Sequence, residues 1–323
     1  MSRLFRRFVV FLLIPFFQGC TLFHVEVIPT PKPLKEKVVE GEGRPKVLLL
    51  DITGLISEKG KEGGLSRENP STVAQVKEVL QKAEKDEDIA GVILQINSPG
   101  GTVTASDIIH HEIMSFKARK KIPVYACITG LGTSGGYYAA TAADLIIAHP
   151  TAITGSIGVL LLKFNVEGLF GKIGVMEQTI KSGEKKDILS PFRASTPEEQ
   201  RIMQTIIDRL AGRFIEVVLA RPNNRLERKE LEKLADGRIY TAEQALTAKL
   251  IDRVGYLDEA IDALKKAAGI KEARVVRYYR PGSYKGSLYS AAQLDAAPSI
   301  NLININADGL EMMATPQFLY LWQ

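Results

Sequence analysis

The chain has 323 residues, of which 45% are hydrophobic, 24% charged and 7% aromatic. This composition suits a folded protein with one large domain, or at most two, and enough apolar content for a real core. The formal net charge is +5, but three arginines in the acid-free first nineteen residues leave 39 basic against 37 acidic residues, or +2, elsewhere. Because no Lys/Arg stripe with interleaved aromatic residues is present either, the sequence argues against a nucleic-acid-binding protein.

The first twenty residues have the pattern of an export signal. Three arginines precede ten apolar residues at 8–17, and a Gly-Cys pair ends at Cys20. Ten residues are too few to cross a hydrocarbon core of about 30 Å comfortably. The Gly-Cys pair resembles a bacterial lipoprotein signal, so we expect residues 1–19 to be removed and Cys20 to be acylated. A plain signal peptide or a short uncleaved anchor is the alternative. The predicted location is the bacterial cell envelope, membrane-anchored, with the folded domain outside the cytoplasm.

Residues 20–46 contain three prolines among Lys and Glu without apolar periodicity, and predict an extended tether. From residue 47 apolar strands alternate with helical patterns, which predicts a single α/β domain over 47–270 with both faces of its sheet covered. Residues 271–323 are less regular and end in an apolar tail that needs a covering surface. The predicted strands are 47–52, 91–96, 124–128, 145–148 and 175–180, and the predicted helices are 73–83, 103–117, one beginning near Ser134, 196–220 and one capped by Thr241.

Two Gly-rich turns follow predicted strands and are candidates for chemistry. The first is Asn-Ser-Pro-Gly-Gly at 97–101, in which Gly100 and Gly101 can aim successive N–H groups outward, as an oxyanion requires. An ordinary strand-to-helix turn is the alternative. The turn lacks the patterns of a phosphate loop and of a dinucleotide site, and we expect neither a cofactor nor a metal.

The second turn is Gly-Leu-Gly-Thr-Ser-Gly-Gly at 130–136. Ser134 opens the helix that follows, where the helix dipole favours negative charge, and Gly135 could donate its N–H to an oxyanion formed at Ser134. A simple N-cap serine is the alternative, and the sequence alone is compatible with both roles.

A nucleophilic serine needs a base within hydrogen-bond reach. The chain has four histidines, and none lies in a Gly-rich setting. A lysine can act as the base if burial removes its charge. Lys185 and Lys186 lie in a loop at 182–192 that, by composition alone, would pass as a solvated turn. The lone core thiol, Cys127, lies inside an apolar strand and is predicted to be structural.

Several motifs in a fixed order resemble the signal peptide peptidase A family of serine peptidases, in its short form, over about residues 47–264. They are Gln-Ile-Asn-Ser-Pro-Gly-Gly-Thr at 95–102, Gly-Thr-Ser-Gly-Gly-Tyr-Tyr-Ala at 132–139, Thr-Gly-Ser-Ile-Gly-Val at 154–159, Gly-Glu-Lys-Lys-Asp at 183–187 with Ser-Pro-Phe at 190–192, and Asp-Gly-Arg-Ile-Tyr-Thr at 236–241. The resemblance implies a Clp protease/crotonase-like spiral of β-β-α units. It also implies membrane-linked cleavage of hydrophobic peptides, including remnant signal peptides.

The resemblance also implies roles for individual residues. Ser134 matches the nucleophile and Lys186 the general base of a Ser–Lys dyad, and Ser156 matches a serine that orients the lysine. Gly135 and the Gly100-Gly101 turn match the oxyanion region. Lys185 stands where the family often has an aromatic or apolar residue. The family association, together with the apolar tail, predicts a ring-like homo-oligomer in which the tail docks on a neighbouring copy.

Three other functions fit parts of the sequence. A Clp-type Ser–His–Asp triad would need a histidine shortly after the nucleophile turn, where 153–159 has none. A crotonase-like acyl-CoA enzyme needs no nucleophilic serine, and the export signal counts against it. An inactive scaffold of the same fold would not need Ser134, Lys186 and the glycine turns intact.

Overall fold

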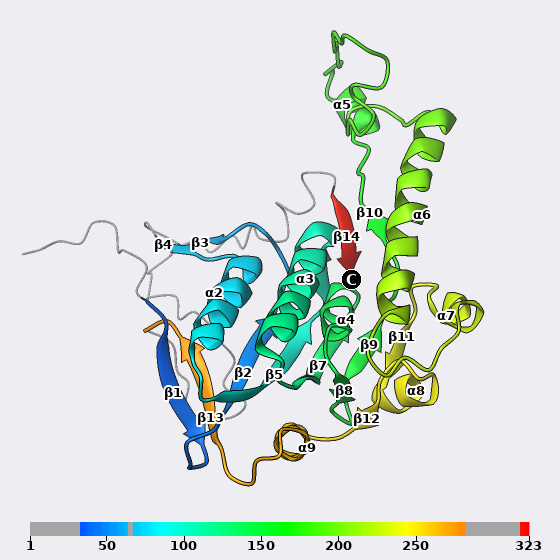
Figure 1. Ribbon diagram of the computed structural model, residues 1–323. Coiled ribbons are helices and arrows are strands. Elements are labelled where there is room, and N and C mark those ends of the chain that lie inside the picture. Colours follow the sequence, from blue (N-terminus) through cyan, green and yellow to red (C-terminus); the bar gives the residue numbers. More distant parts are fainter. Residues whose placement is uncertain (1–32, 64–66, 282–316, 323) are drawn as a thin grey trace, which may run out of the picture.

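The computed structural model describes residues 33–63, 67–281 and 317–322 (Figure 1). A mixed sheet with the strand order β1-β13-β2-β5-β7-β8-β12 forms its centre. All neighbouring strands in this order are parallel except the edge strand β1, which is antiparallel to β13. The bounds are β1 Lys35–Glu40, β13 Arg274–Tyr279, β2 Lys46–Thr53, β5 Ile89–Ser98, β7 Val124–Thr133, β8 Leu145–Ala148 and β12 Arg253–Val254.

Helices cover both faces of this sheet. Leu48, Leu50 and Ile52 of β2 pack in the core under α2 (Thr72–Lys85), α3 (Val103–Lys120), α4 (Gly135–Ala140) and α8 (Ala242–Thr247), which lie on one face. The intervening Val47 and Leu49 pack in a second core under α9 (Leu257–Ala267) on the other face. This period of two is what a strand buried on both faces requires. Cys127 lies in the second core, where burial raises the pKa of its thiol to about 12, as expected for a structural cysteine.

The C-terminal ends of β5 and β7 adjoin shorter strands. The end of β7 pairs with β9 (Ile153–Gly155), which pairs with β11 (Ile239–Thr241). Directly after β5, β6 (Gly100–Thr102) joins a separate small sheet with the order β10-β14-β6, where β10 is Leu160–Leu161 and β14 is Phe318–Leu321. The apolar tail is therefore covered by its own chain, and not by a neighbouring copy as the sequence predicted. The succession β5, β6, α3 is one β-β-α unit of the predicted spiral. A separate antiparallel pair is formed by β3 (Lys61–Gly63) and β4 (Arg67–Asn69).

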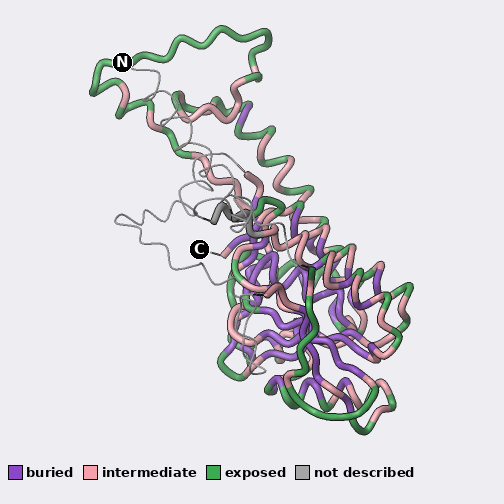
Figure 2. The backbone as a smooth tube through the Cα atoms, turned by 90° about the vertical axis from the view of Figure 1, so that its left-hand side faces the viewer, coloured by how far each residue is buried: buried purple, intermediate pink, exposed green. Residues whose placement is uncertain are grey.

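An arm extends from the body between β10 and the lower half of α6. It comprises residues 163–202 and contains α5 (Glu167–Lys172) and the start of α6 (Pro197–Leu219); α7 (Arg228–Leu234) follows lower down. Figure 1 shows the arm above the sheet, and Figure 2 shows it as mostly exposed beside a buried body. Among the described residues, residues 164–195 make hydrogen bonds only with partners within 163–199. The arm is therefore held together by its own contacts.

The predicted elements agree with the structure in most places. The strand 145–148 has its predicted bounds, and α6 and α8 begin at capping boxes on Thr196 and Thr241. The prediction of a strand at 175–180 is wrong, because these residues form an exposed, irregular part of the arm. Residues 35–40, predicted as tether, form β1, and residues 274–279 of the predicted extension form β13. The sheet thus extends beyond residues 47–270 at both ends. Among the described residues no helix is both long and apolar enough to span a membrane.

A buried ion pair gives a prediction for stability. The guanidinium of Arg277 in β13, 1% exposed, donates hydrogen bonds to Asp51 of β2 and Gln95 of β5. Arg277→Met should lower the free energy of unfolding by about 3–5 kcal/mol, because it leaves the buried Asp51 carboxylate without this cation. Arg44→Ala removes the ion pair with Asp88 at a side chain that is 85% exposed, and it should lower the free energy of unfolding by no more than about 1 kcal/mol. The midpoints of urea unfolding measure the loss of stability in each variant. Equal losses would contradict the assignment of Arg277 and Asp51 as a buried, stabilising ion pair.

Candidate active site

Ser134 occupies a strained turn between β7 and α4. Its φ is +52° and its ψ −116°, a backbone conformation that a residue with a side chain rarely adopts and that costs about 1–3 kcal/mol. Ser134 stands at the N-cap position of α4, yet its side chain makes no capping hydrogen bond. The N-cap alternative therefore leaves the hydroxyl unexplained. A serine held at a sharp strand-to-helix turn is instead the arrangement in which hydrolases present a nucleophile.

Backbone hydrogen bonds hold this turn in place. The Ser134 N–H donates to the Gly155 carbonyl oxygen at 2.7 Å, and the Ser134 carbonyl oxygen accepts from the Tyr138 N–H at 2.9 Å. The residue is only 1% exposed. Within the described residues its hydroxyl has no hydrogen-bond partner, so it is available for chemistry.

The first Gly-rich turn lies directly against this one. Gly100 has a φ of +105°, and a Cβ added to it would lie 2.8 Å from the Gly135 backbone nitrogen. A Cβ added to Gly135 would lie 3.2 Å from the Gly100 Cα. The two glycines therefore permit a close approach that any side chain would prevent. The Gly100 N–H donates to the Ser98 hydroxyl at 3.1 Å, whereas the Gly135 N–H opens α4 and precedes its hydrogen-bond ladder.

Ser156 lies beside Ser134 through the pairing of β7 with β9. Thr133 is opposite Gly155 in the register, and each is followed by a serine with a φ of +52°. The Ser156 N–H donates to the Arg238 carbonyl oxygen at 2.8 Å, and the residue is 7% exposed. The structure thus gathers Ser134, Ser156 and the glycine turns around one point at the end of the parallel strands.

Lys186 lies in the arm, away from this point within the same chain. Its neighbour Lys185 donates to Glu198 in the first turn of α6 at 2.5 Å. Phe214, sixteen residues further along α6, packs its ring 4.9 Å from that of Tyr138 in α4. At about 1.5 Å per residue, Glu198 lies about 24 Å along the α6 axis from Phe214, the residue that contacts the Ser134 helix. The chain alone does not bring Lys186 to Ser134.

The two adjacent lysines have different surroundings. Lys185 is bound to Glu198, whose hydrogen bond raises the pKa of that ammonium and keeps it charged. Lys186 is exposed and has no ion-pair partner among the described residues. Asp187, the acid next in sequence, is engaged elsewhere, because its carboxylate accepts from Lys181 at 2.7 Å and from Arg193 at 2.8 Å.

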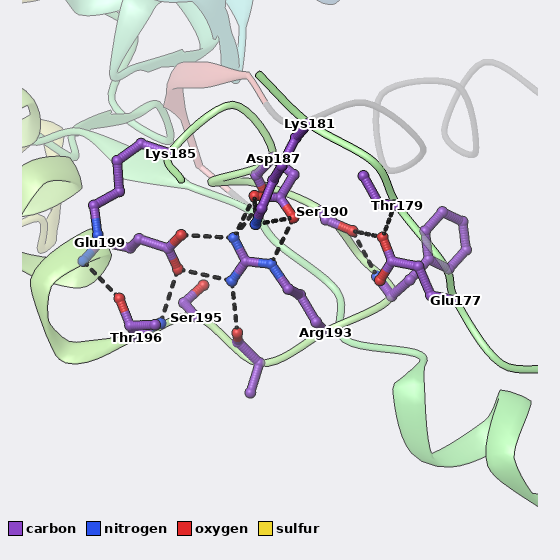
Figure 3. Close-up of polar contacts among 12 residues, drawn as sticks. Glu177, Thr179, Lys181, Lys185, Asp187, Ser190, Arg193, Ser195, Thr196 and Glu199 are labelled. Atoms are coloured by element: carbon purple, nitrogen blue, oxygen red, sulfur yellow. Dashed lines mark hydrogen bonds and ion pairs between the residues drawn. The ribbon is translucent and has the colours of Figure 1, made fainter. Parts of the chain in front are cut away.

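Arg193 is the centre of the ion pairs that shape this segment (Figure 3). Its guanidinium donates to both Asp187 oxygens and to both oxygens of Glu199, at 2.6–2.9 Å. The guanidinium holds the pKa of the Asp187 carboxyl far below its usual range and lowers that of Glu199 to about 2. Glu199 also accepts from the Thr196 N–H at 2.8 Å, so the ion pairs tie the Lys186 loop to the capping box of α6.

The sequence did not identify an aromatic cluster next to the serine. Tyr138 of α4, Phe214 of α6 and Tyr320 of β14 pack with ring centroids 4.7–5.1 Å apart. His110 of α3 packs edge-on against Tyr138, and burial lowers the pKa of its imidazole to about 4. The Tyr-Tyr pair after the serine turn was a visible signal, but its partners come from distant parts of the chain.

The chain is similar to known peptidases. The profile of peptidase family S49 matches residues 116–271, and that of Clp protease matches residues 65–153. An Enterococcus faecium protein with the provisional name signal peptide peptidase SppA is 35% identical over 244 residues, which are 76% of this chain and 70% of that protein. The chloroplastic serine protease SPPA of Arabidopsis thaliana is 32% identical over 75% of this chain, which is 36% of its own length.

Among solved structures, a serine-to-alanine mutant of the membrane-bound stomatin-specific protease 1510-N aligns over 68% of this chain and 85% of its own, with 18% identity and a TM-score of 0.41. The predicted Clp protease-like α/β fold is confirmed by the match to the Clp protease family. Together with the extent of the Enterococcus match, the S49 profile identifies the chain: it belongs to peptidase family S49 and is a serine peptidase.

Proposed function

We propose that this chain is a membrane-anchored serine endopeptidase that cleaves hydrophobic peptides such as remnant signal peptides, with Ser134 as nucleophile and Lys186 as general base. The observation that carries the proposal is the strained, uncapped Ser134 beside Gly100 and Gly135. The substrate class is taken from the relative named as a signal peptide peptidase.

We propose further that Lys186 acts on the Ser134 of a neighbouring copy. Support comes from the arm, which carries Lys186 outward and has its own ion pairs. Eight of the twelve large apolar side chains exposed among the described residues lie in the arm, so it offers an apolar surface to a second copy. They are Phe164, Leu169, Ile173, Val175, Met176, Ile180, Phe192 and Ile202. Contact with a neighbouring body would also exclude water from Lys186, which favours its neutral form.

The chemistry follows from these positions. The neutral Lys186 amine takes the Ser134 hydroxyl proton as the serine oxygen attacks the peptide carbonyl carbon. The resulting oxyanion accepts hydrogen bonds from the glycine turns, with the Gly135 N–H as the first donor. The lysine then gives its proton to the leaving amine, and water hydrolyses the acyl-enzyme. Ser156, beside Ser134, orients the incoming amine.

The dyad is tested by comparing adjacent lysines. Lys186→Ala and Ser134→Ala should each abolish labelling of the protein by a fluorophosphonate, while the folded state is retained. Lys185→Ala, the matched control, should keep most activity, because that lysine is held by Glu198 on the exposed arm. The Ser134→Ala, Lys186→Ala double variant should be hardly worse than either single one, since the two residues act as a unit. An essential Lys185 with a dispensable Lys186 would reverse the assignment.

Mixing two inactive variants tests whether the dyad forms between copies. Ser134→Ala and Lys186→Ala chains, produced together in equal amounts, should recover about a quarter of the wild-type activity, because about a quarter of sites between copies combine an intact serine with an intact lysine. A dyad formed within one chain predicts no recovery, since no chain then carries both residues.

Ser156→Ala should reduce kcat by a smaller factor than either dyad substitution, because an orienting residue acts through the lysine. Ser156→Thr, which keeps a hydroxyl at this position, should retain more of the rate than Ser156→Ala if the hydroxyl orients the lysine. Loss of folding in thermal melts, at equal severity for both variants, would instead assign Ser156 a structural role linked to its left-handed backbone.

The membrane anchor is a separate proposal, because Cys20 lies outside the described residues. Globomycin, which blocks lipoprotein signal cleavage, should accumulate the precursor, and Cys20→Ser should do the same. The mature protein should carry a mass increase from acyl chains, each worth about 0.8 kcal/mol of membrane affinity per buried methylene. Normal processing under both treatments would leave a plain signal or an uncleaved anchor.

A further inference from the structure

Asp187 directly follows the candidate base Lys186, yet the two side chains have different surroundings. Lys186 is exposed, whereas the side chain of Asp187 is only 13% exposed. Both residues lie in a run of helix-like turns, in which the Lys186 N–H donates to the Gly183 carbonyl oxygen at 3.0 Å. Adjacent side chains of a helical turn do not face each other. The loop therefore separates the acid from the base, although the two are neighbours in the sequence.

Two other cations occupy the Asp187 carboxylate completely. A carboxylate offers about four acceptor sites. Arg193 donates to its two oxygens at 2.8 and 2.9 Å, and Lys181 donates to the same two oxygens at 2.7 and 2.9 Å. The hydrogen bonds from Arg193, and then those from Lys181, hold the pKa of the Asp187 carboxyl far below its usual range. Asp187 is thus charged at every pH at which a lysine amine can be neutral, and only its partners keep that charge from Lys186.

Arg193 is in turn fixed by α6. Its guanidinium donates to the two oxygens of Glu199 at 2.6 and 2.9 Å, and the Glu199 side chain is only 2% exposed. Figure 3 shows the guanidinium between the carboxylates of Glu199 and Asp187. An arginine suits this place because its planar fork binds carboxylates in pairs of parallel hydrogen bonds. The direction of the Asp187 side chain is therefore set by a helix terminus and not by the loop alone.

The remaining charged groups around Lys186 have other partners or lie in solvent. Lys185 is paired with Glu198 of α6 at 2.5 Å, and Glu184 is exposed, so that salt screens its charge. On the body, the Arg238 carbonyl oxygen accepts from the Ser156 N–H, and the Arg238 guanidinium is paired with Asp236 at 2.8 Å. Asp187 is therefore the acid whose release would change the charge next to Lys186.

We propose that Arg193 is a positioning residue of the dyad: it turns the Asp187 carboxylate away from Lys186, so that the lysine amine reaches Ser134 of a neighbouring copy without a counter-ion. The inference rests on the proposed function, because it takes Lys186 as the base. An opposite charge within about 4–6 Å shifts a pKa by about 1–3 units toward the charged form. A released Asp187 would keep the amine protonated and unable to take the serine proton. Arg193 itself acts through Lys186.

The experiment measures the rate of fluorophosphonate labelling at Ser134 against pH in the full chain. The acidic limb of the profile should report titration of Lys186, since only the neutral amine is a base. Arg193→Gln releases Asp187 and thereby raises the pKa of the lysine, so the limb should move to higher pH by about one unit. At alkaline pH, where the amine is neutral in both proteins, the rates should converge. Arg201→Gln, the matched control, removes an exposed arginine of α6 and should leave the limb in place.

A second substitution separates charge from shape. Asp187→Asn, added to the Arg193→Gln chain, removes the released carboxylate, so the acidic limb should return to its wild-type position while the contacts of Arg193 stay lost. If Arg193 only keeps the loop in shape, Arg193→Gln should lower the rate by the same factor at every pH, and Asp187→Asn should restore nothing. That result would overturn the proposal.

The outcomes distinguish this proposal from the proposed function. Should Arg193→Gln fail to fold in thermal melts, Arg193→Lys decides instead. A lysine cannot bind two carboxylates in fork geometry, so the limb should still move up and Asp187→Asn should still cancel the move. An unmoved limb in the folded variant, with Lys186→Ala unlabelled, would remove the positioning role alone. Labelling of Lys186→Ala at the wild-type rate would defeat the proposed function.

Discussion

The hydrogen bond from the Ser134 N–H to the Gly155 carbonyl oxygen joins the two turns from which the rest of the site is built. It holds the end of β7 against β9, so that both Ser134 and Ser156 take backbone conformations that side chains disfavour. Two such residues cost about 1–3 kcal/mol each, and they persist because the buried ends of β7 and β9 determine their positions. The same hydrogen bond places Gly135 against Gly100, because α4 begins directly after β7 ends. Strain at Ser134 is therefore inseparable from the geometry that would stabilise an oxyanion.

The arm obeys a different constraint, because little of the body supports it. Only the lower half of α6 has buried apolar residues, at Phe214, Val217 and Val218. In the upper part of the arm, Arg193 binds two carboxylates, one from the Lys186 loop and one from the capping box of α6. These ion pairs hold the segment together where the lower half of α6 relies on buried apolar side chains. Charged hydrogen bonds of this bidentate kind fix geometry as well as supplying energy. The arm can thus hold a loop in a defined shape while leaving its apolar side chains for another surface.

The fold could be predicted from the sequence because its signals are local. Apolar runs on β2, β5 and β7 and the capping boxes at Thr196 and Thr241 each depend on a few neighbouring residues. The strand expected at 175–180 failed for the same reason: an apolar run indicates burial, and these residues are apolar without burial in the single chain. The edge strand β1 has too little apolar periodicity to be recognised, since it pairs on one side only and is mostly exposed. Ser134, Ser156 and the glycine turns were recognised as motifs, whereas the partners of Tyr320 depend on tertiary contacts alone.

A single chain, on the proposed function, lacks one element of its active site. The lysine that should take the Ser134 proton lies on the arm, at the end of α6 that is remote from the Ser134 helix. Activity would then require assembly, because a neighbouring copy supplies the base. The apolar side chains that the arm exposes would be buried in the same step that brings Lys186 to Ser134. Assembly and the exclusion of water from the lysine amine would therefore be one event, and the serine would gain its base only in the assembled protein.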